Sequence, residues 1–162
     1  MTLEDVLRWV HVIAGGAALL IGPATLRAPK RIGVHSRLGE VFFVMATFVC
    51  LSGGTLAVMY WESRWMFFFI ALGTFAYALV GYAAGKRRWR HWLMWHVGGQ
   101  GGAYTGMVTA FIVANWDNVT GTQGTDEPLV FLVPMSLGCI AGGWLLYEVH
   151  HGRRPRVPAE RM

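Results

Sequence analysis

Three polar side chains recur at four-residue intervals inside an apolar stretch of the chain. They are His96, Gln100 and Tyr104, and Thr105 and Thr109 lie nearby. Residues four apart share one face of a helix, so the first three form a slowly drifting stripe. A polar group inside an apolar membrane segment is costly, so the stripe is predicted to face other helices rather than lipid.

Imidazole groups are the second candidate for chemistry. Five of the six histidines are expected on one side of the membrane, where Glu40 and Glu148 also lie: His35, His91, His96, His150 and His151. Paired imidazoles can hold a haem, and imidazole with carboxylate can hold a divalent metal. If a cofactor is bound, His96 is the favoured ligand with His35 opposite it, and His91 is a further candidate. The alternative is that these histidines are hydrated or hydrogen-bonded polar residues at a membrane interface.

The sixth histidine, His11, is expected near the other side. It lies about 8 Å below the outer edge of its helix, and His96 lies about 6 Å from the inner edge, at 1.5 Å per residue. In a hydrocarbon core about 30 Å thick the two differ by about 16 Å in height. They cannot ligate one metal ion. His11 completes the set of intramembrane polar residues and is predicted to meet Tyr104, Thr105 or Thr109.

Five apolar windows are long enough to position these residues across a membrane, which takes about 20 residues. The chain has 162 residues, of which 54% are hydrophobic and 14% charged, and a mean hydropathy of +0.41. The windows are 6–26, 39–60, 65–84, 92–114 and 129–148. Only helices satisfy the backbone of so short a chain in lipid. We therefore predict an all-α polytopic membrane protein, a bundle of five transmembrane helices.

Basic residues set the expected orientation. They gather in the first loop, the third loop and the C-terminal tail: Arg27, Lys30, Arg31, Arg37, Lys86, Arg87, Arg88, Arg90, Arg153, Arg154, Arg156 and Arg161. By the positive-inside rule these segments face the cytoplasm, which places the N-terminus outside and the C-terminus inside. The predicted domains are a transmembrane domain over 1–152 and a basic cytoplasmic tail over 153–162. The positive charge predicts contact with the bilayer and its anionic lipid, not with nucleic acid.

Glycines predict close helix packing. Gly81 lies near the end of the third window and Gly85 directly after it, and Gly98, Gly99, Gly101 and Gly102 cluster in the fourth. Small residues four apart let two helix backbones approach. The same glycines could instead leave space for a flat cofactor ring beside the fourth helix.

Other chemistry finds no support in the sequence. No serine lies in a nucleophile-elbow context, and no phosphate-binding loop occurs. Cys50 and Cys139 each lie within an apolar run, and the chain has neither a CxxC metal motif nor a CxxCH haem attachment motif. Catalysis is therefore not expected, although the sequence leaves the question open.

Residues 11–23, 35–42 and 102–115 together resemble a family of uncharacterised bacterial membrane proteins known as domain of unknown function 2306. The likeness covers about residues 5–148. It implies a multi-pass protein of the bacterial inner membrane without an established activity. The family's histidine near the start of helix one corresponds to His11, and its His-Arg-x-x-Gly pattern corresponds to His35, with Ser36 in place of the arginine.

The same pattern is similar to that of cytochrome b561-like proteins, which hold two haems between histidines on opposite sides. Here the outer side offers only His11, so one inner haem is the most that fits. Two function classes remain. The favoured one is a non-enzymatic membrane protein, an accessory subunit or a small carrier, with a membrane protein partner or as a homo-oligomer. The alternative is a redox protein that binds one b-type haem or a quinone near the cytoplasmic histidines.

Overall fold

A computed structural model describes residues 1–29, 33–121 and 128–151 of the chain. Those residues form five α-helices: α1 (Leu3–Arg27), α2 (Val34–Met59), α3 (Trp61–Arg87), α4 (Trp92–Thr120) and α5 (Pro128–His150). The prediction of an all-helical fold is confirmed. α1, α3 and α5 extend beyond both ends of their predicted windows, α2 begins earlier than its window but ends at Met59, and α4 continues past the end of its window. The tail 153–162 and the basic residues Lys30 and Arg31 lie outside the described residues.

Two segments expected in loops are helical. His35 was predicted to precede the second helix, yet it lies in the first turn of α2. The stretch 115–128 lies between two predicted windows, but α4 continues to Thr120, and 122–127 lies outside the described residues. Thr120 donates a hydrogen bond to the carbonyl of Trp116. The Thr120 hydroxyl therefore has a hydrogen-bond partner within the last turn of α4.

Four helices are long and apolar enough to cross a membrane: α1, α2, α3 and α5, searched over the described residues. α4 has 29 residues, so its length is sufficient. It carries His96, Gln100, Tyr104 and many glycines, which lower its hydropathy. The membrane character of the chain is supported, whereas the count of five spans stays a prediction.

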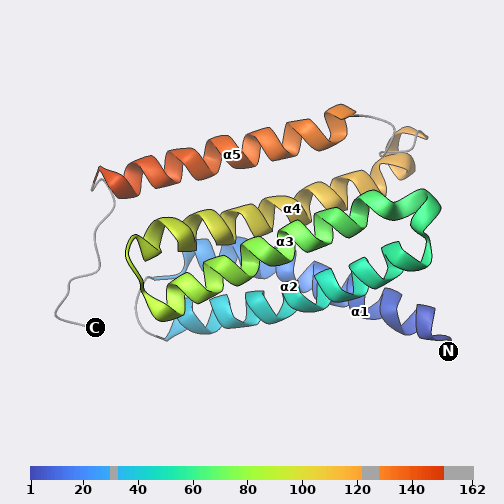
Figure 1. Ribbon diagram of the computed structural model, residues 1–162, viewed down its shortest axis with the longest axis horizontal. Helices are drawn as coiled ribbons and strands as arrows, with labels where there is room; N and C mark the ends of the chain where they lie inside the picture. Colours follow the sequence, from blue (N-terminus) through green and yellow to red (C-terminus); the bar gives the residue numbers. More distant parts are fainter. Residues whose placement is uncertain (30–32, 122–127, 152–162) are drawn as a thin grey trace.

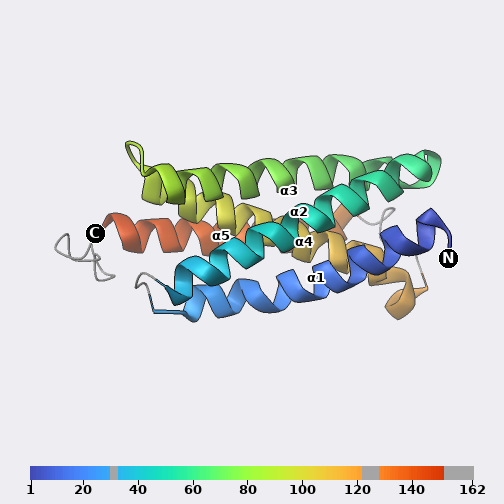
Figure 2. The ribbon, with the colours of Figure 1, turned by 90° about the horizontal axis from the view of Figure 1, so that it is seen from below.

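The first four helices form a bundle, and α5 lies outside it against α4 (Figures 1 and 2). Neighbours in sequence are neighbours in space, and a contact between α1 and α4 closes the bundle. Small side chains fill the centre, where Ala18, Ala46, Ala78 and Ala103 are fully buried. Such residues let helices approach closely. α4 contacts α1, α3 and α5, so protein surrounds it on three sides.

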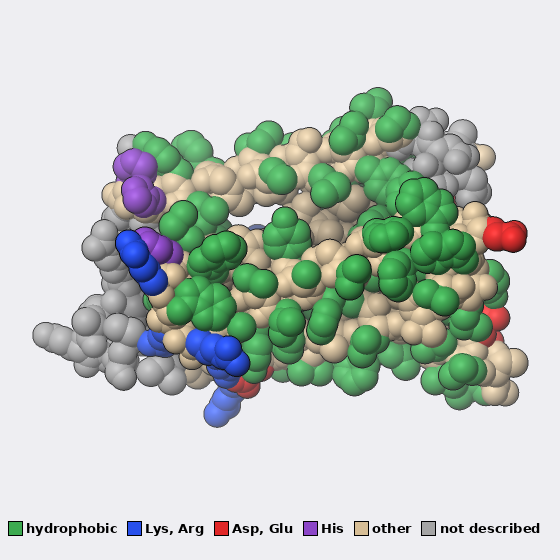
Figure 3. All heavy atoms as spheres, viewed as in Figure 1, with side chains coloured by type: hydrophobic (Ala, Val, Ile, Leu, Met, Phe, Trp, Pro, Cys, Tyr) green, Lys and Arg blue, Asp and Glu red, His purple; other side chains and the backbone are tan. Residues whose placement is uncertain are grey.

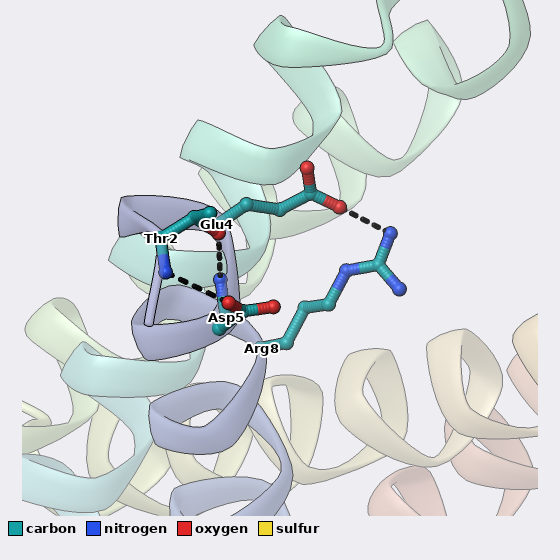
Figure 4. Close-up of polar contacts among 4 residues, drawn as sticks. All are labelled: Thr2, Glu4, Asp5 and Arg8. Carbon is teal, nitrogen blue, oxygen red and sulfur yellow. Dashed lines mark hydrogen bonds and ion pairs between the residues drawn. The ribbon is translucent and has the colours of Figure 1, made fainter.

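The N-terminus of α1 is closed by a capping box (Figure 4). The Thr2 hydroxyl accepts a hydrogen bond from the Asp5 backbone N–H at 3.2 Å, and the Asp5 carboxylate accepts one from the Thr2 N–H at 2.8 Å. Together they satisfy donors that a helix start leaves unpaired. One turn on, Glu4 forms an ion pair with Arg8. This end of α1 is therefore a polar, well-terminated helix start.

Charge separates along the bundle axis. Figure 3 shows lysine, arginine and histidine side chains at the end where α5 finishes, most acidic side chains at the opposite end, and an apolar band between them. The exceptions among the described residues are Glu40, which pairs with Lys86 at the basic end, and Glu148, which lies near the end of α5. An apolar band with unlike charges at its two rims matches a protein that lies across a bilayer.

Candidate functional site

The centre of the site is a backbone contact between α3 and α4. A Cβ atom built on Gly81 would lie 2.7 Å from the backbone nitrogen of Gln100, and one built on Gly99 would lie 2.5 Å from the backbone nitrogen of Gly81. Real Cβ atoms do not come so close. The two helices can therefore cross at this distance only because both positions are glycine. The crossing brings carbonyl groups of α3 within reach of side chains on α4.

Two residues of the predicted stripe use those carbonyls. The ring nitrogen Nδ1 of His96 lies 2.8 Å from the carbonyl oxygen of Gly81, and the Gln100 amide donates to the carbonyl oxygen of Ala78 at 3.2 Å. Gly85 makes room for the imidazole, because a Cβ there would lie 2.8 Å from Nδ1 of His96. These hydrogen bonds give each polar side chain a partner on α3 and tie α4 to α3.

Tyr104 continues the stripe but contacts a different helix. Its hydroxyl donates to the carbonyl oxygen of Leu19 on α1 at 3.2 Å, and its ring lies over Gly22. Four residues turn a helix by about 40° beyond one full turn, so the eight residues from His96 rotate the stripe by about 80°. That drift carries it from the α3 side of α4 to the α1 side, and α4 is thereby bonded to two neighbours.

The two threonines beside the stripe have other roles. Thr109 is buried, and its hydroxyl donates to the carbonyl of Thr105 within α4 at 2.9 Å. Thr105 lies where α5 passes, because a Cβ built on Gly138 would collide with its side chain. Thr105 therefore packs against α5, and neither threonine meets His11.

His11 lies against α2, contrary to the expectation that it would meet Tyr104, Thr105 or Thr109. Its Nδ1 lies 3.2 Å from both the carbonyl oxygen of Val49 and the hydroxyl of Ser52. Gly53 makes room for the ring, since a Cβ there would lie 2.8 Å from Cε1 of His11. The turn of α1 that carries His11 faces α2, while α1 meets α4 further along, at Leu19 and Gly22.

The structure brings His35 and His96 together. Their ring centroids are 6.2 Å apart, and the planes are inclined at 76°. Nδ1 of His35 lies 3.0 Å from the carbonyl oxygen of Thr25, just as Nδ1 of His96 lies near Gly81. Metal-ligating histidines usually hold one ring nitrogen on a carbonyl in this way. The juxtaposition was predicted from sequence, but a ligand role for the pair stays a prediction.

The remaining candidates do not join this pair. Glu40 pairs with Lys86, and Glu148 accepts a hydrogen bond from the Trp144 indole at 3.1 Å. His91 is exposed at the start of α4 and lines a groove between α3, α4 and α5. Within residues 1–29, 33–121 and 128–151, no three His, Cys, Asp or Glu side chains gather as a metal site.

Only part of the space predicted beside the glycines of α4 is open. The backbone of α3 fills the room next to Gly99, and the Tyr77 ring fills that next to Gly102. Gly98 and Gly101 face open space. A flat ring beside Gly99 and Gly102 would therefore displace α3, so these two glycines serve packing.

No family model, curated protein or solved structure matches the chain. The resemblance to the domain of unknown function 2306 family therefore stays a prediction, and so do the roles that it implies for His11 and His35. Any function proposed for the chain must rest on its own geometry.

Proposed function

We propose that this chain is a non-enzymatic integral protein of the bacterial inner membrane, an accessory subunit whose polar stripe holds its own helices together. In this proposal all five helices cross the bilayer, with the N-terminus outside and the C-terminus in the cytoplasm. The basic end seen in Figure 3 supports that orientation through the positive-inside rule. α4 crosses despite its lower hydropathy because its polar groups are bonded within the bundle.

One observation carries the proposal. Four polar side chains in the apolar band contact backbone carbonyls of neighbouring helices: His96 on Gly81, Gln100 on Ala78, Tyr104 on Leu19 and His11 on Val49. A transport path needs polar groups that can exchange partners with a solute or with water. Side chains bonded to the carbonyls of tightly packed helices act as links instead. This favours the accessory subunit over a small carrier.

α5 is the surface on which to test for a partner. It packs mainly on α4 and leaves most of its large apolar side chains exposed, Ile140 at 69%. A photo-crosslinking amino acid at Ile140, activated in native membranes, should give an adduct with a different membrane protein. The same amino acid at Leu20 of α1, which is 77% exposed and lies on a different helix, is the control and should not give that adduct.

The mass of the Ile140 adduct separates the outcomes. An adduct with a second kind of chain supports the accessory role. An adduct whose mass is twice that of the chain identifies a homo-oligomer and contradicts a heteromeric role. If neither Ile140 nor Leu132, which is 57% exposed, gives any adduct, the accessory proposal fails.

A redox role is the second candidate, and the His35–His96 pair is the observation that favours it. Two imidazoles that ligate one iron from opposite sides have centroids about 6 Å apart, for metal–nitrogen bonds of about 2 Å. The observed separation is 6.2 Å. Two imidazole ligands suit a b-type haem, whereas a divalent metal normally takes three or more protein ligands. A haem in this place would lie at the basic end of the bundle, between α2 and α4.

The visible absorption spectrum tests the redox candidate. Protein purified from cells supplied with haem should show a Soret band, and His35→Ala and His96→Ala should each abolish it while the protein stays folded. His91→Ala is the matched control and should keep the band, because His91 lines a different surface of α4. A parent protein without pigment rejects this candidate and leaves the accessory role untouched.

A further inference from the structure

A groove runs between α3, α4 and α5 on the outside of the bundle. Its lining includes Gly73 and Tyr77 of α3, His91, Trp95 and Gly98 of α4, and Leu146 of α5. Its volume is about 660 Å³, within the ~300–1,000 Å³ typical of small-molecule sites. Figure 3 shows a hollow between α5 and the rest of the bundle. Apart from His91, the Tyr77 hydroxyl and the Trp95 indole N–H, these lining side chains are apolar or absent.

The groove is long and follows the helix axes. Thr74 packs against the position of Gly106, so the neighbouring Gly73 lies at about the level of that residue. From there to His91 is 15 residues of α4, which span about 22 Å at 1.5 Å per residue. Half of a hydrocarbon core measures about 15 Å. A groove of this length with glycines in its lining suits an extended hydrocarbon chain.

The end of the groove at His91 is basic. The connection from α3 to α4 carries Arg87, Arg88 and Arg90, and the Arg88 guanidinium lies 5.5 Å from the centre of the Trp92 ring. α4, which is described along its whole length, has no acidic residue in its first turn and no side-chain cap at His91. The positive end of its dipole therefore adds to the arginines. This charge is complementary to a phosphate group.

We propose that the groove binds one anionic phospholipid, with an acyl chain between α3, α4 and α5 and its phosphate at the connection between α3 and α4. The proposal rests on the membrane location proposed above. It adds a specific, stoichiometric site to the general attraction between basic loops and anionic membranes. The apolar lining matches an acyl chain, and the positive charge at one end matches a phosphate group. A phospholipid has both parts, whereas a fully apolar chain lacks the phosphate.

Two glycine variants separate binding in the groove from general helix stability. A Cβ on Gly98 or on Gly101 would meet open space, so neither position resists a side chain. Gly98 lines the groove and Gly101 does not. Gly98→Leu should therefore fill the groove without breaking the fold, and Gly101→Leu, three residues along the same helix, is the matched control. Replacing Arg90 and His91 together by glutamine tests the headgroup end.

The experiment is native mass spectrometry of the purified full chain in detergent, with phosphatidylglycerol or phosphatidylcholine of identical acyl chains. The parent and Gly101→Leu should each retain one phosphatidylglycerol, at least tenfold more strongly than phosphatidylcholine. Gly98→Leu should lose that binding by tenfold or more. The double variant Arg90→Gln/His91→Gln should prefer phosphatidylglycerol less strongly than the parent does, because Arg87 and Arg88 retain part of the positive charge. Circular dichroism and melting temperature verify that each variant is folded.

Three results would overturn the inference. Equal lipid retention by Gly98→Leu and the parent would place any bound lipid elsewhere. Equal binding of the two lipids by the parent would refute the role of the basic end. A dimer that Gly98→Leu dissociates would assign the groove to a second copy of the chain. The lipid measurement needs no partner protein, so its result is independent of the crosslinking at Ile140.

Discussion

Gly99 of α4 lies directly against the backbone of Gly81 of α3, with no side chain between them. A Cβ on Gly99 would lie 2.5 Å from the Gly81 nitrogen and 2.7 Å from the carbonyl oxygen of Tyr77. The contact sets the distance between the two helices. It thereby determines whether His96 and Gln100 can reach the carbonyls of α3.

Gly99→Leu should prevent stable folding, because the new side chain would meet backbone atoms that cannot move aside. Overpacking typically costs about 1–3 kcal/mol, and contact with the backbone of α3 at both Gly81 and Tyr77 places this change at or above the upper end. Gly102→Leu should cost less, since the atoms in its way belong to the Tyr77 ring, which can rotate. Gly101→Leu should change little. Thermal unfolding in detergent gives the order, and a Gly99→Leu variant as stable as Gly101→Leu would contradict the tight crossing.

Tyr104→Phe should lower the free energy of unfolding by about 0.6 kcal/mol, the average measured for hydrogen bonds between helices in membranes. The change removes only the hydroxyl that donates to Leu19. Tyr77→Phe is the control, because the Tyr77 ring is 56% exposed; it should be neutral in lipid-free detergent. Equal effects of the two variants would show that the bond to α1 contributes nothing specific.

Gly53→Ala should destabilise the contact between α1 and α2. The new methyl would lie 2.8 Å from Cε1 of His11, so the ring would have to move away from Val49 and Ser52. Gly54→Ala provides the comparison, since its methyl would meet Ala71 at an ordinary 3.8 Å. That change should stabilise α2 by about 0.5–1 kcal/mol through helix propensity. A higher melting temperature for both variants would refute the assigned position of His11.

Reporter fusions should locate both ends of the helices relative to the membrane. Fusions after Arg31, Arg88 and Arg156 should report the cytoplasm, and fusions at Ser63 and Gly121 should report the outside. The Gly121 fusion is decisive because it follows α4, the helix of lower hydropathy. A cytoplasmic signal there would mean that α4 does not cross, and the five-span proposal would fail.

The amino-acid sequence by itself determined the helical class and which residues needed partners. Long apolar runs in lipid can satisfy their backbone only as helices, so five helices were predictable from composition and length. The stripe of His96, Gln100 and Tyr104 was equally predictable, because a four-residue period places residues on one helical face. The expected depth of each histidine predicted that His35 could reach the level of His96, whereas the 6.2 Å between their ring centroids depends on how the helices pack.

The identity of the partners was decided only by the tertiary structure. His96, Gln100, Tyr104 and His11 bond to backbone carbonyls. Every residue carries a carbonyl, so no side-chain pattern marks the acceptor. Which carbonyl comes within reach depends on where two helices cross, and the glycines that permit the crossing do not specify which helix fills the space. For that reason His11 was assigned to α4 from sequence, whereas the packing of α1 places it on α2.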